Sequence, residues 1–366
     1  MKKVLFFRPT LSEGGADRVT AVVLRGLDRT RYRPVLVLLR KEGPFVGDLP
    51  SDVEVIELGS RRLAFSLPAF ARVLRRENPD IVFSTCSASN VIATIAHTLV
   101  RSRARLVLSE RNALYRGRKH THPKQATEVA LKRLTYRRAD VVTAVSQGVA
   151  DELAEIGVRR DRIAVVYNPI VDADLETQAS AAVDHPWFQT GAPPIVLACA
   201  RLVPQKDYPT LLDAFAQIRR AITCRLWVLG NGPLHDELVA RASSLGLADD
   251  VHFAGFDKNP FKYMARARLL IHASRAEGLP GTLIQTMACG TPVVSTDCDF
   301  GPREVISSGR DGYLVPVGDA TSLAKRAVQI LCDGAHRDSL ATAAHASAQR
   351  FSVATSLALY HQALEA

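Results

Sequence analysis

Long apolar runs are absent from this 366-residue sequence. The apolar run near the start covers only residues 4–7, and the weakly polar stretch at 91–100 is interrupted by His97. Neither approaches the ~20 residues of a membrane-spanning helix, and the first is too short for the core of a signal peptide. The sequence therefore predicts a cytoplasmic protein without a targeting or membrane-spanning segment.

Paired cysteine motifs are also missing. The six cysteines are scattered, and no two of them form a Cys-x-x-Cys pair. This spacing favours neither a zinc site nor a disulfide framework. We expect reduced thiols, as in the cytoplasm, and no bound metal.

An excess of positive charge is confined to the first half of the chain. Residues 1–180 contain 30 Lys and Arg against 20 Asp and Glu, whereas residues 181–366 contain 17 of each. A basic face suits nucleic acid, anionic lipid or a phosphorylated substrate, and a merely solvated surface is the alternative. Because no nucleic-acid-reading module is recognisable, nucleic acid is not expected as a partner.

An anionic membrane surface is the partner that we expect for the basic half, on the inner face of the cell membrane. The charge is densest at residues 101–138. A second candidate is the stretch 67–76, where Arg72, Arg75 and Arg76 alternate at helical spacing with apolar residues. Such a pattern predicts shallow amphipathic insertion.

Strand and helix signals alternate along the chain. Apolar runs at 3–8, 34–39, 80–84, 105–109 and 140–145 alternate with helical spacing at 18–27, 89–100 and 127–138. The alternation restarts at 194–200 and continues beyond 292–295. This order predicts an α/β fold with two doubly wound, Rossmann-like domains facing across a cleft. We place the domains at 1–170 and 193–348, with a linker at 171–192 and a final helix at 349–366 that returns to the first domain.

Two short segments at predicted strand ends could hold an anion. Gly14 and Gly15 open the first helix, where free amides and a helix dipole favour an anion, although Gly-Gly is also an ordinary turn. Arg201 and Lys206 follow the first strand of the second half. Two cations there suit a diphosphate, and solvated loop charges are the alternative.

The longest informative segment covers residues 276–294 and reads AEGLPGTLIQTMACGTPVV. Glu277 can accept hydrogen bonds from sugar hydroxyls, or it can cap the helix that follows. The amides near Gly281 lie at a helix N-terminus, where they suit an anion. Gln285 follows on that helix, within reach of a ribose.

This segment resembles the signature of the family-4 retaining glycosyltransferases, which have the GT-B fold. That family typically shows two glutamates eight positions apart, followed by a small-x-Gly-x-Pro-Val-Val ending. The resemblance continues through Gly14-Gly15, the Arg201 and Lys206 pair, and the segments 166–169, 230–233, 301–304 and 311–315. It therefore covers nearly the whole chain.

The resemblance implies a hexosyl- or N-acetylhexosaminyltransferase of bacterial polysaccharide or lipopolysaccharide biosynthesis. The donor would be a nucleoside-diphosphate sugar, such as a UDP-sugar, and the acceptor a saccharide or lipid-linked saccharide. The first domain would bind the acceptor and the second the donor.

The resemblance also implies roles for individual residues. Arg201 and Lys206 would hold the diphosphate, and Glu277 would contact the transferred sugar. No metal or other cofactor is implied, because cations and a helix N-terminus take the place of the ion. The further donor-binding residues would be Gly14, Gly15, Gly232, Gly255, Phe256, Gly278, Leu279, Pro280, Gly281, Thr282, Leu283 and Gln285.

Two departures from the family pattern stand out. Gln285 replaces the second glutamate, and an amide has one acceptor oxygen for the two ribose hydroxyls. The first half carries Glu110, Arg111 and Asn112 after a strand, where members of the family often have a histidine near the acceptor. These three residues are candidates for acceptor contact.

Two other functions remain open. A nucleotide-sugar 2-epimerase shares the fold, and a non-catalytic nucleotide-sugar-binding protein would tolerate Gln285. Product analysis without acceptor separates the first from a transferase, and donor hydrolysis or transfer excludes the second.

Overall fold

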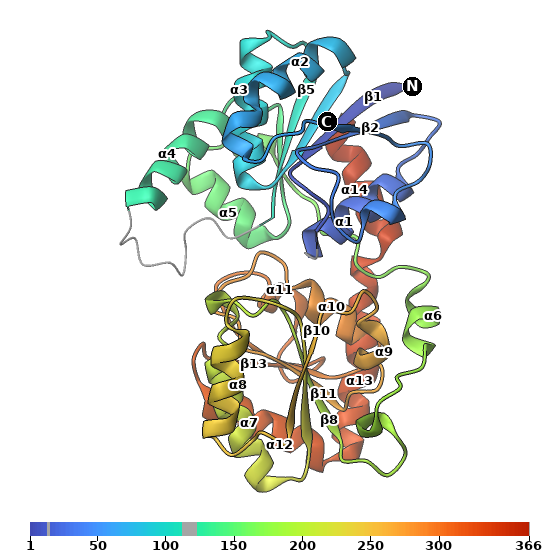
Figure 1. Ribbon diagram of the computed structural model, residues 1–366, viewed down its shortest axis with the longest axis vertical. Coiled ribbons are helices and arrows are strands. Elements are labelled where there is room, and N and C mark those ends of the chain that lie inside the picture. The colour runs from blue at the N-terminus through green and yellow to red at the C-terminus, as the bar shows by residue number, and fades with distance from the viewer. Residues whose placement is uncertain (13–14, 112–122, 366) are drawn as a thin grey trace. The chain divides into compact units, whose positions relative to one another are not determined.

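The computed structural model describes residues 1–12, 15–111 and 123–365. The chain divides into two compact units (Figure 1). The first unit combines Met1–Pro169 with the C-terminal residues from Val353, and the second is Ile170–Ser352.

Parallel strands form the centre of the first unit. The described residues build a seven-stranded sheet in the order β3-β2-β1-β4-β5-β6-β7. All its pairings are parallel, for example Lys2 with Tyr32 and Val4 with Ile81. These strands are runs of Val, Leu, Ile and Phe because helices cover both faces of such a sheet. Their bounds are β1 Lys2–Arg8, β2 Tyr32–Leu38, β3 Glu54–Glu57, β4 Ile81–Thr85, β5 Arg105–Glu110, β6 Val141–Ala144 and β7 Ile163–Val165.

Helices α1 to α5 of the first unit lie between these strands in the sequence, whereas α14 follows the second unit. One of them, α2, corrects an expectation from the sequence. Its apolar residues Phe70, Val73 and Leu74 are buried, so they pack on the protein and the predicted insertion of this face into a membrane is wrong. The bounds are α1 Gly15–Gly26, α2 Leu67–Glu77, α3 Ser87–Leu99, α4 Pro123–Tyr136, α5 Gln147–Glu155 and α14 Val353–Glu365.

The C-terminal helix α14 packs within the first unit (Figure 1). The ring of Tyr360 lies 5.9 Å from that of Phe83, and the Tyr32 hydroxyl donates to Glu365 over 3.0 Å. Gly26 of α1 allows close approach, because a Cβ atom there would lie 2.3 Å from Leu357.

The second unit repeats the plan with a six-stranded parallel sheet in the order β10-β9-β8-β11-β12-β13. Its strands are β8 Ile195–Cys199, β9 Arg225–Leu229, β10 Val251–Gly255, β11 Leu269–His272, β12 Val293–Thr296 and β13 Tyr313–Val315. Its helices are α6 Leu175–Ser180, α7 Tyr208–Ala221, α8 His235–Ser244, α9 Phe261–Met264, α10 Gly281–Ala288, α11 Pro302–Val305, α12 Ala320–Cys332 and α13 Gly334–Ala348. The α/β class predicted from the sequence is confirmed.

Residues 171–192, the expected linker, are folded onto the second unit. They contain α6, whose Gln178 carbonyl accepts from Asn259 over 2.8 Å. Further along, the Phe188 ring lies 5.0 Å from that of Trp227. The segment thus contributes apolar contacts to that unit.

Within the described part of the chain, no helix combines the length and apolar character needed to cross a membrane.

Candidate functional site

The strand order of the second sheet reverses between β8 and β11. β8 leads outward to β9 and β10, and β11 leads the other way to β12 and β13. Ligands of open α/β sheets bind beyond the carboxyl ends of the strands at such a reversal. The loops that follow β8 and β11, residues 200–207 and 273–280, therefore form the first place to look for a site.

An ion pair joins these two loops. Lys206 Nζ lies 2.5 Å from Glu277 Oε1, and the two side chains are 17% and 9% exposed. Burial raises the pKa of Glu277, but the attraction of Lys206 and the hydrogen bonds from His272 and Lys206 outweigh it. The net effect is a pKa far below the ordinary value, so the carboxylate stays charged.

His272 fixes the position of Glu277 from the end of β11. Its Nε2 lies 3.0 Å from Glu277 Oε1, and its Nδ1 lies 3.0 Å from Ser295 Oγ on β12. Ser274 Oγ also lies 3.0 Å from Nε2. All these side chains are buried, so the carboxylate of Glu277 is held in one orientation.

One oxygen of Glu277 remains available to a ligand. Oε1 accepts from both Lys206 and His272, whereas Oε2 has no hydrogen-bond partner in the described residues. Gln205 ties the two loops together, donating to the Ala276 carbonyl over 2.6 Å and accepting from the Arg275 amide over 2.9 Å. Glu277 can thus offer a preorganised acceptor to a hydroxyl group.

Free amides follow Glu277 at the start of α10. The backbone N–H groups of Gly278, Leu279, Gly281 and Thr282 donate to no described residue. Leu283 and Ile284 donate to the Pro280 carbonyl, over 3.1 and 3.4 Å. Unpaired amides at a helix N-terminus attract an anion.

The turn at residues 230–233, which follows β9 and contains two glycines, lies against the loop after β8. A Cβ atom on Gly232 would lie 2.3 Å from the Leu202 carbonyl oxygen. The Gly230 amide donates to the Gly255 carbonyl over 2.7 Å, and Gly255 has a φ of +72°. Phe256 follows, half-buried. The turn thus places Gly232, Gly255 and Phe256 near the carboxyl ends of β9 and β10.

Arg201 and Gln285 have side chains that no described residue engages. Arg201 is exposed, two residues beyond β8, and has no ion pair or side-chain hydrogen bond there. Gln285 is half-buried one turn into α10 and is likewise unpaired. Both side chains are therefore free to contact a ligand.

The two described acceptor candidates of the first unit are buried. Glu110, at the end of β5, accepts from Ser87 over 2.8 Å and from Tyr136 over 2.8 Å. Lys132 lies 3.7 Å from it and is 4% exposed. Burial and the charge of Glu110 raise the pKa of Tyr136 well above its ordinary value, so its hydroxyl remains a donor.

Arg111 holds the start of α1 and the last helix. It is 6% exposed and donates to the Ala16 carbonyl over 3.0 Å and to the Tyr360 hydroxyl over 3.2 Å. Gly15 is the first residue of α1. Gly14 and Asn112, the other candidates of this unit, lie outside the described residues.

His272 is the residue of this site that the sequence interpretation missed. A polar residue ending an apolar strand, five positions before Glu277, was the available signal. Among the residues that the structure describes, no group of His, Cys, Asp and Glu could hold a metal ion.

The site combines a buried carboxylate, an ammonium group, a free guanidinium group and free helix amides at one sheet edge. Cations and amides at this position can bind a diphosphate and stabilise negative charge on a leaving group. The free oxygen of Glu277 can orient a neighbouring hydroxyl group.

Two family models match successive parts of the sequence. Residues 13–174 match the model described as Glycosyltransferase Family 4, and residues 193–333 match that of Glycosyl transferases group 1.

Relatives with assigned activities are similar over most of the chain. One is N-acetylgalactosamine-N,N'-diacetylbacillosaminyl-diphospho-undecaprenol 4-alpha-N-acetylgalactosaminyltransferase of Campylobacter jejuni, 28% identical over 88% of both chains. Another is the lipopolysaccharide core biosynthesis glycosyltransferase LpsE of Rhizobium meliloti, 27% identical over 91% of this chain and 90% of its own.

A solved structure shares the architecture. Alr3699/HepE of Anabaena in complex with UDP-glucose superposes with a TM-score of 0.84, at 25% identity, over 100% of this chain and 99% of the other. The two parallel sheets and this likeness define a GT-B protein, which confirms the fold predicted from the sequence.

The chain belongs to the family 4 glycosyltransferases, as its resemblance to that family predicted, and it is a glycosyltransferase of glycan biosynthesis.

Proposed function

We propose that this glycosyltransferase transfers a hexosyl or N-acetylhexosaminyl group from a UDP-sugar to a saccharide or lipid-linked saccharide acceptor, with retention of anomeric configuration. The observation that carries the proposal is the Lys206–Glu277–His272 arrangement beside the free amides of α10. The relatives named above supply the class of acceptor, and the HepE complex supplies UDP-glucose as a donor to test first.

In this proposal the diphosphate binds Arg201, Lys206 and the amides at the start of α10. These groups offset the charge that develops on the leaving phosphate, which lowers the barrier most if they are already in place. Lys206 is in place because Glu277 holds it, and Arg201 is exposed and unpaired among the described residues. Gly232, Gly255, Phe256 and Gln285 would contact the nucleoside.

Glu277 would orient the transferred sugar through its free oxygen rather than act as a nucleophile. A carboxylate with a lowered pKa that is already bound to Lys206 is a weak nucleophile. We therefore propose front-face attack by the acceptor, assisted by the leaving phosphate. Because two cations and helix amides serve the diphosphate, we propose that transfer needs no divalent metal.

A thermal-shift screen against nucleotide sugars tests the donor, since a ligand that binds only the native state raises the melting temperature. The positive donor is then incubated with lipid-linked saccharides, with and without EDTA, and the anomeric configuration of the product is determined by NMR. An inverted product contradicts the mechanism, and loss of activity in EDTA contradicts metal independence. A 2-epimer formed without acceptor assigns the chain as an epimerase.

A further inference from the structure

The strand order of the first sheet also reverses, between β1 and β4. The carboxyl ends of these two neighbouring strands therefore lie where an open α/β sheet binds ligands. Arg8, the last residue of β1, donates to the Thr85 hydroxyl at the end of β4 over 3.2 Å, so the two strand ends are tied together. A serine follows each strand: Ser12 after β1 is exposed, and Ser87 after β4 is half-buried.

The hydroxyl proton of Ser87 points into the protein. Ser87 Oγ donates to the carboxylate of Glu110, lying 3.0 Å from Oε1 and 2.8 Å from Oε2. Glu110 is fully buried, and Tyr136 and Lys132 of α4 lie 2.8 and 3.7 Å from it. The Tyr136 hydroxyl gives its own proton to Glu110, and no described residue donates to Ser87 Oγ. The lone pairs of Ser87 are therefore available to a ligand.

Ser12 repeats this arrangement after β1. Its hydroxyl donates to Oδ2 of Asp17 over 3.1 Å, and Asp17 is only 5% exposed. Arg8 holds the other carboxylate oxygen, Oδ1, with its Nε 2.7 Å away. The Thr10 hydroxyl lies 3.5 Å from Ser12 Oγ, which is long for a bond between hydroxyl groups. Ser12 thus also turns its proton inward and its lone pairs outward.

Two hydroxyl groups that can only accept select the chemistry of their ligand. A serine hydroxyl has one proton, and in both cases a buried carboxylate takes it. A phosphate group offers acceptor oxygens, which would face the lone pairs of the two serines. A sugar hydroxyl can donate to these lone pairs, and the carboxylate behind each serine strengthens such a bond through cooperativity.

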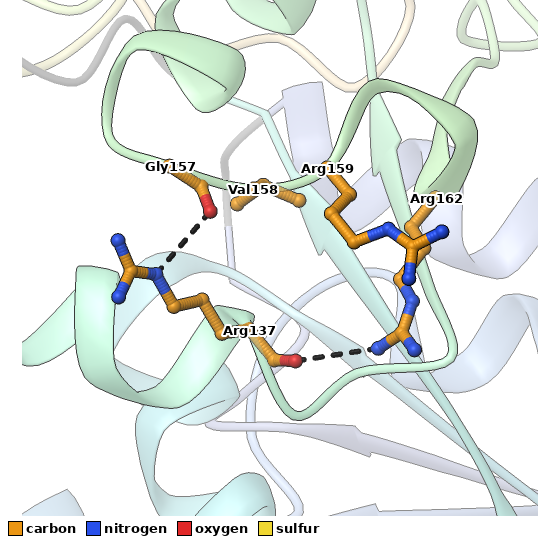
Figure 2. A pocket seen from close by; sticks show the side chains of 5 residues that line it. All are labelled: Arg137, Gly157, Val158, Arg159 and Arg162. Atoms are coloured by element: carbon orange, nitrogen blue, oxygen red, sulfur yellow. Dashed lines mark hydrogen bonds between the residues drawn. The ribbon is translucent and has the colours of Figure 1, made fainter.

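A cavity at the opposite edge of this sheet differs from the serine pair. Its lining comes from the segments that precede β6 and β7 and consists of Arg137, Gly157, Val158, Arg159 and Arg162. Figure 2 shows the guanidinium group of Arg137 pointing away from those of Arg159 and Arg162. Arg137 and Arg162 donate to main-chain carbonyls, so these side chains join two loops rather than converge on a ligand.

We propose that Ser12 and Ser87 accept hydrogen bonds from hydroxyl groups of the acceptor saccharide, so that the first unit selects a neutral sugar ring over a phosphate group. Asp17 and Glu110 are positioning residues, since they act through the two serines. This inference rests on the proposed function, because it takes a saccharide as the acceptor.

Saturation-transfer NMR of the full chain tests the inference directly, without a donor. The probes are the methyl glycosides of glucose, galactose and N-acetylgalactosamine, and analogues of each in which fluorine replaces one hydroxyl group. Fluorine can accept a hydrogen bond but cannot donate one. The test variants are S12A and S87A, which leave both carboxylates bound to their other partners. The matched control is S102A, which replaces a half-buried serine between α3 and β5, at the opposite edge of the sheet.

We expect the wild type to bind at least one methyl glycoside, and replacement of one of its hydroxyl groups by fluorine to weaken binding about tenfold. S12A and S87A should each weaken binding of the parent glycoside by about the same factor. In the variant that lacks the partner of a given hydroxyl group, fluorine at that position should cause no further loss. S102A should bind like the wild type, and thermal unfolding checks that all variants are folded.

The absence of binding of every glycoside to the wild type contradicts the inference, as do fluorinated analogues that all bind as tightly as their parents. If S12A and S87A both bind like S102A, the two serines are not part of a sugar site. Glucose 6-phosphate that binds more tightly than methyl glucoside, with the same dependence on Ser12 and Ser87, would assign the site to an anion. The thermal-shift screen measures donor binding independently of these results, so a failure of the proposed function is recognised separately.

Discussion

Replacing Lys206 with methionine tests the central ion pair. Met keeps an unbranched apolar chain of similar length, so the substitution removes the charge and little packing. Lys206 and Glu277 are 17% and 9% exposed, so the pair is buried. Removing one partner of a buried pair costs about 3–5 kcal/mol, because the other charge remains in a site of low polarity. His272 still donates to Glu277, so we expect about 3 kcal/mol for K206M.

The loss of stability in K206M should depend on pH in a defined direction. In the wild type the pKa of Glu277 is lowered, so its contribution is present above the unfolded pKa and is lost only as the pH falls toward the folded value. Without Lys206, burial is no longer offset to the same extent, and the pKa of Glu277 rises. Glu277 of the variant therefore binds a proton at higher pH. The stability difference should be largest near about pH 7 and shrink toward about pH 4.

Urea unfolding followed by tryptophan fluorescence measures this difference. Trp187 and Trp227 are the two tryptophans of the chain, and both belong to the second unit, which contains the pair. The double variant K206M/E277Q is the control, because it leaves no unpaired buried charge and should recover much of the lost stability. If K206M is as stable as the wild type, or if its loss is the same at both pH values, the reasoning about the pair is wrong.

The other predictions concern the remaining site residues. R201A should lower kcat/KM by about 30- to 1,000-fold with an unchanged melting temperature, because Arg201 is exposed and has no described partner; near-normal turnover removes it from the mechanism. At subsaturating donor, E277A should lose more activity than E277Q, whose amide keeps one acceptor oxygen; two variants as active as the wild type contradict sugar contact. Q285E should bind UDP more tightly by calorimetry, since a carboxylate accepts from both ribose hydroxyls; equal affinity excludes the ribose role. G232A should lower the stability of the second unit by about 1–3 kcal/mol, because its Cβ atom would lie 2.3 Å from the Leu202 carbonyl oxygen; unchanged urea unfolding would show that the turn can move.

Much of the fold of this protein can be predicted from its sequence, because the spacing of apolar residues and the succession of strands and helices can be read directly along the chain. Alternating apolar strands and amphipathic helices indicate two parallel sheets, and the carboxyl ends of parallel strands share one edge. Lys206 and Glu277 each follow such a strand, so they could be assigned to one site although 71 positions separate them.

Tertiary packing decided which of these groups are free and which are engaged. Arg201 and Lys206 look alike in sequence, but only Lys206 meets a buried carboxylate, since the loop after β11 carries Glu277 to it. His272 also belongs to the site because the fold places its side chain beside Glu277.

Packing also decided which faces are covered. The spacing of apolar residues along α2 shows that Phe70, Val73 and Leu74 share a side of the helix. It does not show that the rest of the protein covers that side. Glu110 and Arg111 end a strand in the same way as ligand-binding residues do, yet both side chains are buried against partners distant in the sequence. A sequence pattern describes one element at a time, whereas burial and pairing depend on the neighbours that the fold places against it.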